Sequence, residues 1–137
     1  MKIDVCFSPA LYPVYHNPEA IVVVVDVFRA TTTMAAAFKH GVRSIRPVAT
    51  VEEAQEYKAK GWLVGAERNV KRCDFADFGN SPFDYTPEKV AGKDVIFTTT
   101  NGTRAIIIAK SAYRVITGAF VNFQAVADYC LFHRSEE

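Results

Sequence analysis

The sequence feature that most constrains the fold is the stretch Ile21–Thr33, which reads IVVVVDVFRATTT. Its first five residues are β-branched and show no polar alternation, a pattern typical of a strand buried on both faces in a parallel sheet. The strand is expected to end at Asp26, and a helix to begin at about Arg29–Thr31. The free backbone N–H groups of that first turn, the guanidinium and the threonine hydroxyls together predict an anion site.

The rest of the chain alternates short aliphatic runs with segments of helical pattern. Strands are expected at Lys2–Phe7, Ser44–Val48, Trp62–Gly65, Asp94–Phe97 and Arg114–Thr117, with a connecting loop at Ser8–Glu19. Helices are expected from Arg29–Thr31 to His40, from a Thr50–Glu53 capping box to Lys60, at Ile106–Ala112 and at Val121–His133. Such alternation predicts a single α/β domain over residues 1–137, with a largely parallel sheet.

Composition narrows the class of function. The formal net charge is +1 and no block of like charges occurs, which argues against a nucleic-acid or membrane-surface protein. No apolar run is long enough to span a bilayer, and no secretory signal pattern is present at the N-terminus. The three cysteines are widely spaced and form no CxxC pair, so reduced thiols in a cytoplasmic protein are expected.

Periodicity disappears between residues 66 and 92, a segment rich in Asp, Asn, Gly, Pro and aromatic residues. A loop of this length in a compact domain is usually functional or disordered, and its aromatic content argues against disorder. We therefore expect it to pack against the domain, with a turn at Asp77–Pro82. Asn80 and Ser81 are either turn formers or polar groups that close over a ligand.

An Arg-Ala pair occurs twice at the expected start of a helix that follows a buried strand, at Arg29 and at Arg104. If the two strands lie parallel in one sheet, both arginine-bearing loops emerge at its carboxyl edge, where α/β sheets bind ligands. Two such helix starts would suit a substrate with more than one negative group. The alternative for each arginine is a surface ion pair or a cap on a neighbouring carbonyl group.

Asp26 admits an N-cap role, a metal-ligand role or a nucleophilic role. A carboxylate about 4 Å from one phosphate charge costs roughly 4 kcal/mol at an effective dielectric constant near 20. A bridging Mg²⁺ ion would remove this cost, because carboxylate and phosphate oxygens are its normal ligands. Glu67 is a second candidate ligand, with a plain surface pair to Arg68 as the alternative.

The run Thr98–Thr100 and the Asn101-Gly102 pair after it can be strand residues and a tight turn. They can also supply hydroxyl groups and close backbone N–H groups to an oxyanion. The histidines share no metal or triad spacing. The sequence contains no G-x-G-x-x-G and no G-x-x-x-x-G-K-[ST], so nucleotide binding has no motif to support it.

Five blocks in this order resemble the 2-phosphosulfolactate phosphatase family: DVFRATTT, GAER (Gly65–Arg68), DFGNSP (Asp77–Pro82), the Gly92-Lys93 pair, and TTTNGTRA (Thr98–Ala105). The resemblance spans nearly the whole chain. It implies a three-layer α/β/α fold and a Mg²⁺-dependent phosphatase. The implied reaction hydrolyses 2-phospho-3-sulfolactate to 3-sulfolactate and phosphate, as in coenzyme M biosynthesis.

By position in these motifs, the resemblance places the site on residues from four of the blocks. Asp26, Arg29 and Arg104 are interpreted as catalytic, and Asp26 and Glu67 as metal ligands. The residues interpreted as substrate-binding are Thr31, Thr32, Thr33, Asn80, Ser81, Thr100, Asn101, Gly102 and Thr103.

The resemblance covers only the N-terminal half of the family's usual length, so the C-terminal half is expected to be absent. The alternative function is accordingly an inactive anion-binding fragment of the same enzyme. Exposed sheet edge or apolar helix surface would then favour a homo-oligomer.

Overall fold

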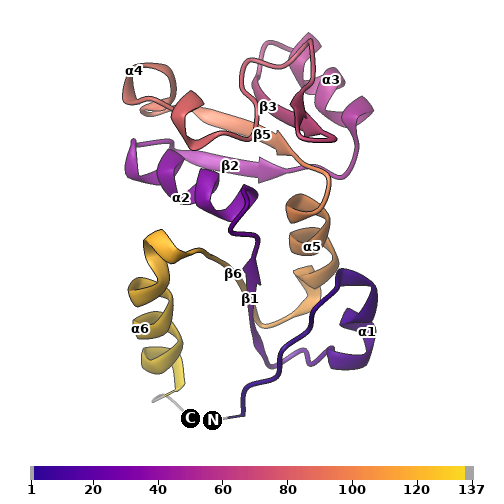
Figure 1. The fold of residues 1–137 in the computed structure, drawn as a ribbon, viewed down its shortest axis with the longest axis vertical. Coiled ribbons are helices and arrows are strands. Elements are labelled where there is room, and N and C mark those ends of the chain that lie inside the picture. Colours follow the sequence, from indigo (N-terminus) through magenta and orange to yellow (C-terminus); the bar gives the residue numbers. More distant parts are fainter. Residues whose placement is uncertain (1, 135–137) are drawn as a thin grey trace.

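The computed structural model describes residues 2–134 and shows two groups of strands with helices around them (Figure 1). In this part of the chain, one sheet pairs β1 with β6 and a second has the order β2-β5-β3-β4. All pairings are parallel except the short hairpin between β3 and β4. The strand bounds are β1 Ile21–Val25, β2 Ser44–Pro47, β3 Leu63–Arg68, β4 Lys71–Arg72, β5 Asp94–Thr98 and β6 Arg114–Gly118.

Helices connect most of these strands. The α-helices are α1 Tyr12–Tyr15, α2 Ala30–Lys39, α3 Val51–Ala59, α4 Pro87–Val90, α5 Gly102–Ile108 and α6 Phe123–Arg134. Short 3₁₀ turns occur at Pro9–Leu11, Pro82–Asp84, Ala109–Ser111 and Phe120–Asn122. α2 and α3 end as expected, because Gly41 and Gly61 follow them with φ of +87° and +86°. No helix in residues 2–134 has the length and apolar character needed to cross a membrane.

The larger sheet is covered on both faces. Ala30, Met34 and Ala37 of α2 pack with Val95 and Phe97 of β5 in one buried cluster. Ala54 of α3 packs with Val64 and Ile96 in a second cluster on the other face. Side chains of neighbouring strand positions point to opposite faces of a sheet, so these two clusters form separate layers. The predicted three-layer α/β/α arrangement with a largely parallel sheet is confirmed here.

The first cluster extends under the 66–92 segment, which packs down as predicted. Phe78 and Tyr85 are buried in it, and Tyr85 Oη donates a hydrogen bond of 2.8 Å to the carbonyl oxygen of Gly79. Gly65 leaves room for this phenol, because a Cβ atom on it would lie 2.1 Å from Tyr85 Oη and 2.8 Å from the Phe97 ring. The segment also contributes β4 and α4, so it is less irregular than its sequence suggests.

β1 lies outside the larger sheet. The condition that the strands before Arg29 and Arg104 lie parallel in one sheet is therefore not met, since β1 pairs only with β6 within residues 2–134. The chain passes from β1 into α2, which crosses from the smaller sheet to the larger one (Figure 1). The carboxyl ends of β1 and β5 nevertheless meet, because the loop after β1 contacts the start of α5.

Other predicted boundaries shift where tertiary contacts outweigh local pattern. Lys2–Phe7 forms no strand, and Ser8–Glu19 contains a 3₁₀ turn and α1. The strand predicted at Trp62–Gly65 continues to Arg68, because β5 and β4 supply partners for it. The helix predicted from Ile106 begins four residues earlier, at Gly102, since Thr99 and Thr103 close its first turn through their side chains.

Candidate functional site

The first turns of α2 and α5 touch at Gly102. A Cβ atom on Gly102 would lie 2.4 Å from Ala30 Cβ and 3.0 Å from Asp26 Oδ2. Ala30 opens α2 and is fully buried, so the absence of a side chain at Gly102 is what lets the two helix starts approach. This contact brings the backbone at Arg29 and at Arg104, each within two residues of it, into the same region of the molecule. The Asp26 carboxylate lies against this junction.

The loop from β1 into α2 is closed by its own hydrogen bonds. The Asp26 N–H donates to Thr31 Oγ1 at 3.0 Å, and the Thr31 N–H donates to the Asp26 carbonyl oxygen at 3.1 Å. Thr32 Oγ1 donates to the Val27 carbonyl oxygen at 2.8 Å, and Thr33 Oγ1 donates to that of Asn80 at 3.1 Å. These hydroxyl groups hold protein segments together, and their contact with a substrate stays a prediction.

Thr103 behaves in the same way at the second helix start. It is fully buried, and its hydroxyl donates to the Thr99 carbonyl oxygen at 3.1 Å while accepting from the Thr99 N–H at 3.1 Å. Thr100 and Asn101, by contrast, are exposed at the rim. Thr103 therefore shapes the turn, whereas Thr100 and Asn101 remain accessible.

Glu67 is held at the carboxyl edge of the larger sheet. Ala66 pairs with Thr98 in the parallel register of β3 and β5, so Glu67 follows the last pair of that ladder. The residue is 7% exposed, and its Oε1 accepts hydrogen bonds from the Val70 N–H at 2.7 Å and Thr100 Oγ1 at 3.0 Å. Oε2 accepts no hydrogen bond from residues 2–134. One carboxylate oxygen is therefore fixed while the other is available to a ligand.

The alternative of a plain Glu67–Arg68 surface pair is wrong. The Arg68 guanidinium donates to the backbone carbonyl oxygen of Glu67 at 2.6 Å and to Thr98 Oγ1 at 2.8 Å. It makes no ion pair with the Glu67 carboxylate. Arg68 therefore ties the end of β3 to β5 and leaves the carboxylate uncompensated.

The charge on Glu67 acts on the Asp26 carboxyl group. Burial raises the pKa of the Asp26 carboxyl above its usual value, a backbone hydrogen bond from Ala30 lowers it in part, and the Glu67 charge raises it further. Neither carboxylate belongs to an ion pair in the described part of the chain. Two poorly solvated like charges without a cation are costly, which is the condition that a bound cation relieves.

The donor set fits a hard divalent cation. No group of three or more His, Cys, Asp or Glu side chains gathers within residues 2–134, so a site with many protein ligands is not formed there. Mg²⁺ typically uses one or two carboxylates and completes its shell with water and substrate oxygens. Asp26 and Glu67 match that requirement.

Three further polar side chains, on or next to the segments that form this junction, have groups without a hydrogen-bond or ion-pair partner within residues 2–134. Asn80 is 7% exposed, and its Oδ1 is buried without a hydrogen bond. Neither the Arg29 nor the Arg104 guanidinium makes a hydrogen bond or ion pair with the rest of residues 2–134. A buried amide oxygen and two uncompensated cations are suited to a ligand that carries both hydrogen-bond donors and negative charge. Ser81 is half-buried beside Asn80 and makes no cap hydrogen bond.

The backbone N–H of Val70 is a positioning group that was not predicted from the sequence. Asn69 and Val70 join β3 to β4 with φ of +51° and +67°, a two-residue turn in which both central residues are left-handed. Asn-Gly is the usual sequence signal for such a hairpin turn. Here Val70 occupies the second position in place of glycine, so the turn could not be recognised from the sequence. Val70 is 79% exposed, so packing does not explain why a β-branched residue occupies this turn.

Replacing Val70 by Gly is expected to stabilise the protein by about 1 kcal/mol, because it removes the left-handed strain and keeps the N–H that holds Glu67. Urea unfolding measures this change. Asn69→Gly is the matched control and is expected to change stability little, since Asn tolerates this conformation. A loss of stability in Val70→Gly would show that the valine side chain itself supports the turn.

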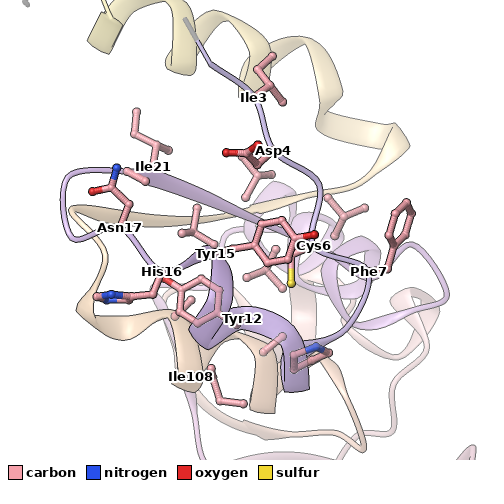
Figure 2. Close-up of a pocket in the computed structure, with 18 of the residues that line it drawn as sticks. Ile3, Asp4, Cys6, Phe7, Tyr12, Tyr15, His16, Asn17, Ile21 and Ile108 are labelled. Atoms are coloured by element: carbon pink, nitrogen blue, oxygen red, sulfur yellow. The ribbon is translucent and has the colours of Figure 1, made fainter.

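A cleft of about 1560 Å³ opens beside the Asp26 end of the junction. Its walls come from the N-terminal segment, α1, β1, α5 and α6, and Figure 2 shows many of its side chains. Asp26, Asn101 and Gly102 lie among its lining residues. The junction is therefore reachable from this cleft.

Comparison with known proteins gives one consistent result. A family model described as "2-phosphosulpholactate phosphatase" matches residues 6–136. A protein of Caldanaerobacter subterraneus subsp. tengcongensis named "Probable 2-phosphosulfolactate phosphatase" is 45% identical over 115 residues, which cover 81% of this chain and 48% of the relative. Proteins of the same name from Carboxydothermus hydrogenoformans and Clostridium perfringens are 44% and 43% identical, covering 96% and 94% of this chain.

These two relatives are covered over 54% and 55% of their own length, so the chain spans about half the length of the curated relatives it matches. The match to the family model, by contrast, takes in nearly all of this chain. The chain belongs to the 2-phosphosulfolactate phosphatase family.

Proposed function

We propose that this chain takes part in Mg²⁺-dependent hydrolysis of a small phosphorylated sulfonate, 2-phospho-3-sulfolactate, to 3-sulfolactate and phosphate. The observation that carries the proposal is the pair of uncompensated carboxylates, Asp26 and Glu67, at a junction of two helix starts that also bears two unpaired arginines. The relatives' names support the choice of substrate. A cytoplasmic role in coenzyme M-type biosynthesis is part of the same proposal.

Asp26 and Glu67 would hold the metal ion, which supplies charge neutralisation at the phosphoryl oxygens. Phosphoryl transfer passes through a loose transition state with charge spread over those oxygens, so catalysis depends on alignment and electrostatic stabilisation. Arg29 is assigned to the phosphoryl group. Arg104, with Asn101, is assigned to the sulfonate or carboxylate.

Binding measurements test whether Arg29 and Arg104 contact different groups of the substrate. Arg104→Ala is expected to weaken binding of 3-sulfolactate about 10- to 100-fold, the scale of a lost charge-assisted hydrogen bond, and to leave inorganic phosphate binding unchanged. Arg29→Ala is expected to weaken binding of inorganic phosphate by a similar factor and to leave binding of 3-sulfolactate unchanged. Isothermal titration in the presence of Mg²⁺ measures both affinities.

Lys110→Ala, an exposed cation after α5, is the charge-matched control for these two variants. Equal loss of both ligands in both arginine variants would contradict the assignment, because it would mean that the two guanidinium groups bind as one diffuse cationic patch.

The role of Asp26 in the chemical step has two alternatives, attack on phosphorus or support of the metal ion with water as the nucleophile. A single turnover in ¹⁸O-labelled water tests for attack by Asp26. Label that enters the Asp26 carboxylate rules out direct attack by water on phosphorus. Label in phosphate alone is expected both for direct attack by water and for a phosphoaspartate hydrolysed at phosphorus.

The alternative function is an anion-binding fragment without turnover. A direct assay of this chain with 2-phospho-3-sulfolactate and Mg²⁺ decides between the two. Phosphate release that requires Mg²⁺ supports the enzyme, and saturable binding of substrate without release supports the fragment.

A further inference from the structure

The N-terminal segment Lys2–Phe7 has a strand pattern but no strand partner. Ile3, Val5 and Phe7 alternate along it and are 72%, 60% and 90% exposed. None of its backbone groups forms a backbone hydrogen bond within residues 2–134. Apolar alternation with an unpaired backbone is the pattern of a strand whose neighbour is missing.

The smaller sheet is incomplete in the same region. Within residues 2–134, β1 has only β6 as a neighbour, and Val25 at its end is 63% exposed. Parallel strands are normally buried on both faces, and two strands alone are marginally stable in water. All five residues of β1 line the cleft, so the uncovered side of this sheet and the unpaired N-terminal segment face one common space.

The walls of that space are mostly apolar. Figure 2 shows Ile3 and Phe7 on the N-terminal segment, Tyr12 and Tyr15 on α1, and Ile21 on β1 around it. Tyr12 buries its phenol oxygen without a hydrogen-bond partner. A cleft of about 1560 Å³ is larger than ordinary small-molecule sites, which measure about 300–1,000 Å³.

We propose that this cleft is a docking surface for a second α/β polypeptide segment, which adds a strand between Lys2–Phe7 and β1. The occupant is the counterpart of the half that this chain does not match in its relatives. Those relatives carry roughly as many residues again in one covalent chain, since the matched part is 48–55% of their length. In the relatives, tethering gives that half a high effective concentration at the corresponding face.

The docked segment would also complete one wall of the functional site. Asp26 and Gly102 lie among the residues that line the cleft. An occupant of the cleft therefore excludes water from one side of the Asp26 carboxylate, where charge interactions then strengthen. The docking proposal does not depend on the identity of the substrate.

Co-expression tests the proposal. The chain would be produced together with the unmatched half of the Caldanaerobacter relative, and the mixture examined by size-exclusion chromatography with light scattering. The expected result is a one-to-one complex, in which amide hydrogen exchange slows at residues 2–7 and 21–25 relative to the chain alone.

Ile3→Asp is expected to weaken the complex at least tenfold, because it places a charge on the docking strand. Its thermal unfolding alone should match that of the unsubstituted chain, since Ile3 is 72% exposed. Phe83→Asp, at an 88% exposed residue outside the cleft lining, is the matched control and should leave the complex unchanged.

Three results would overturn the proposal. The first is a homodimer of this chain that protects the same residues, because a second copy would then be the occupant. The second is protection confined to other segments in the complex, and the third is absence of any complex on co-expression.

Discussion

Replacing Asp26 by Asn is expected to abolish Mg²⁺-dependent phosphate release, with a loss of about 10³-fold or more, the scale on which a charge-stabilising group acts. The same change is expected to raise the stability of the metal-free protein near neutral pH. Both effects follow from one feature, which is an ionised carboxylate kept beside Glu67 without a cation from the protein.

The pH dependence of this stability change has a definite sign. The pKa of Asp26 is higher in the folded protein than in the unfolded chain, because burial and the Glu67 charge disfavour the ionised form. The contribution of Asp26 to the free energy of unfolding is therefore fully present at low pH, and it is lost as the pH rises through the pKa of Asp26 in the folded protein. The amide side chain in the Asp26→Asn variant does not ionise and has no such loss. The stability advantage of this variant should therefore be present at pH 7 and should shrink as the pH falls toward about 4.

Thermal unfolding with and without Mg²⁺ separates the metal site from the chemical step. Mg²⁺ at about 100 times its dissociation constant should stabilise the unsubstituted protein by about 2.7 kcal/mol. Asp26→Asn and Glu67→Gln should lose this response, and Glu56→Gln, an exposed carboxylate on α3, should keep it. A full Mg²⁺ response in Asp26→Asn would remove Asp26 from the metal site whatever the activity shows.

Replacing Gly65 by Ala is expected to destabilise the fold by roughly 2–5 kcal/mol, the sum of overpacking a core and disturbing a buried hydrogen bond. The added Cβ would lie 2.1 Å from Tyr85 Oη and 2.8 Å from the Phe97 ring. Tyr85 is fully buried, and its hydroxyl holds the Gly79 carbonyl oxygen, so the ring cannot simply move aside. Against a typical total of about 5–15 kcal/mol, this loss leaves little stability.

A double-mutant cycle assigns the loss to this contact. Tyr85→Phe removes the oxygen atom nearest the new methyl group, so Gly65→Ala/Tyr85→Phe should be less destabilised than the two single losses added together. Chemical denaturation measures all four proteins. Simple additivity would contradict the proposed clash and would direct attention to the Phe97 ring.

Several local elements of the fold could be predicted from the sequence. The aliphatic runs at β1 and β5, the glycines after α2 and α3, and the Thr50 cap are local signals, and each appears in the structure. The sequence also placed Asp26, Glu67 and the two arginines at or just after the carboxyl ends of strands, and the structure agrees with that placement. Their roles in a site stay a prediction.

Other features depend on contacts that no local pattern encodes. Lys2–Phe7 has a strand pattern, but a strand exists only where a neighbour supplies hydrogen bonds. The buried threonines look like free donors in sequence, and only the fold shows that Thr33 Oγ1 bonds the Asn80 carbonyl oxygen. Gly102 was interpreted as part of a tight turn or as a glycine that lets backbone N–H groups approach an oxyanion, and only the fold shows that it also lets two helix starts approach each other.

Asp26 follows a strand of the smaller sheet, and Glu67 is the penultimate residue of a strand of the larger one. No hydrogen-bonded ladder joins these two sheets within residues 2–134. The sheets are connected instead through α2 and α5, whose first turns touch at Gly102. An ion shared by both side chains would consequently add a direct link between two sheets that otherwise contact each other through helices.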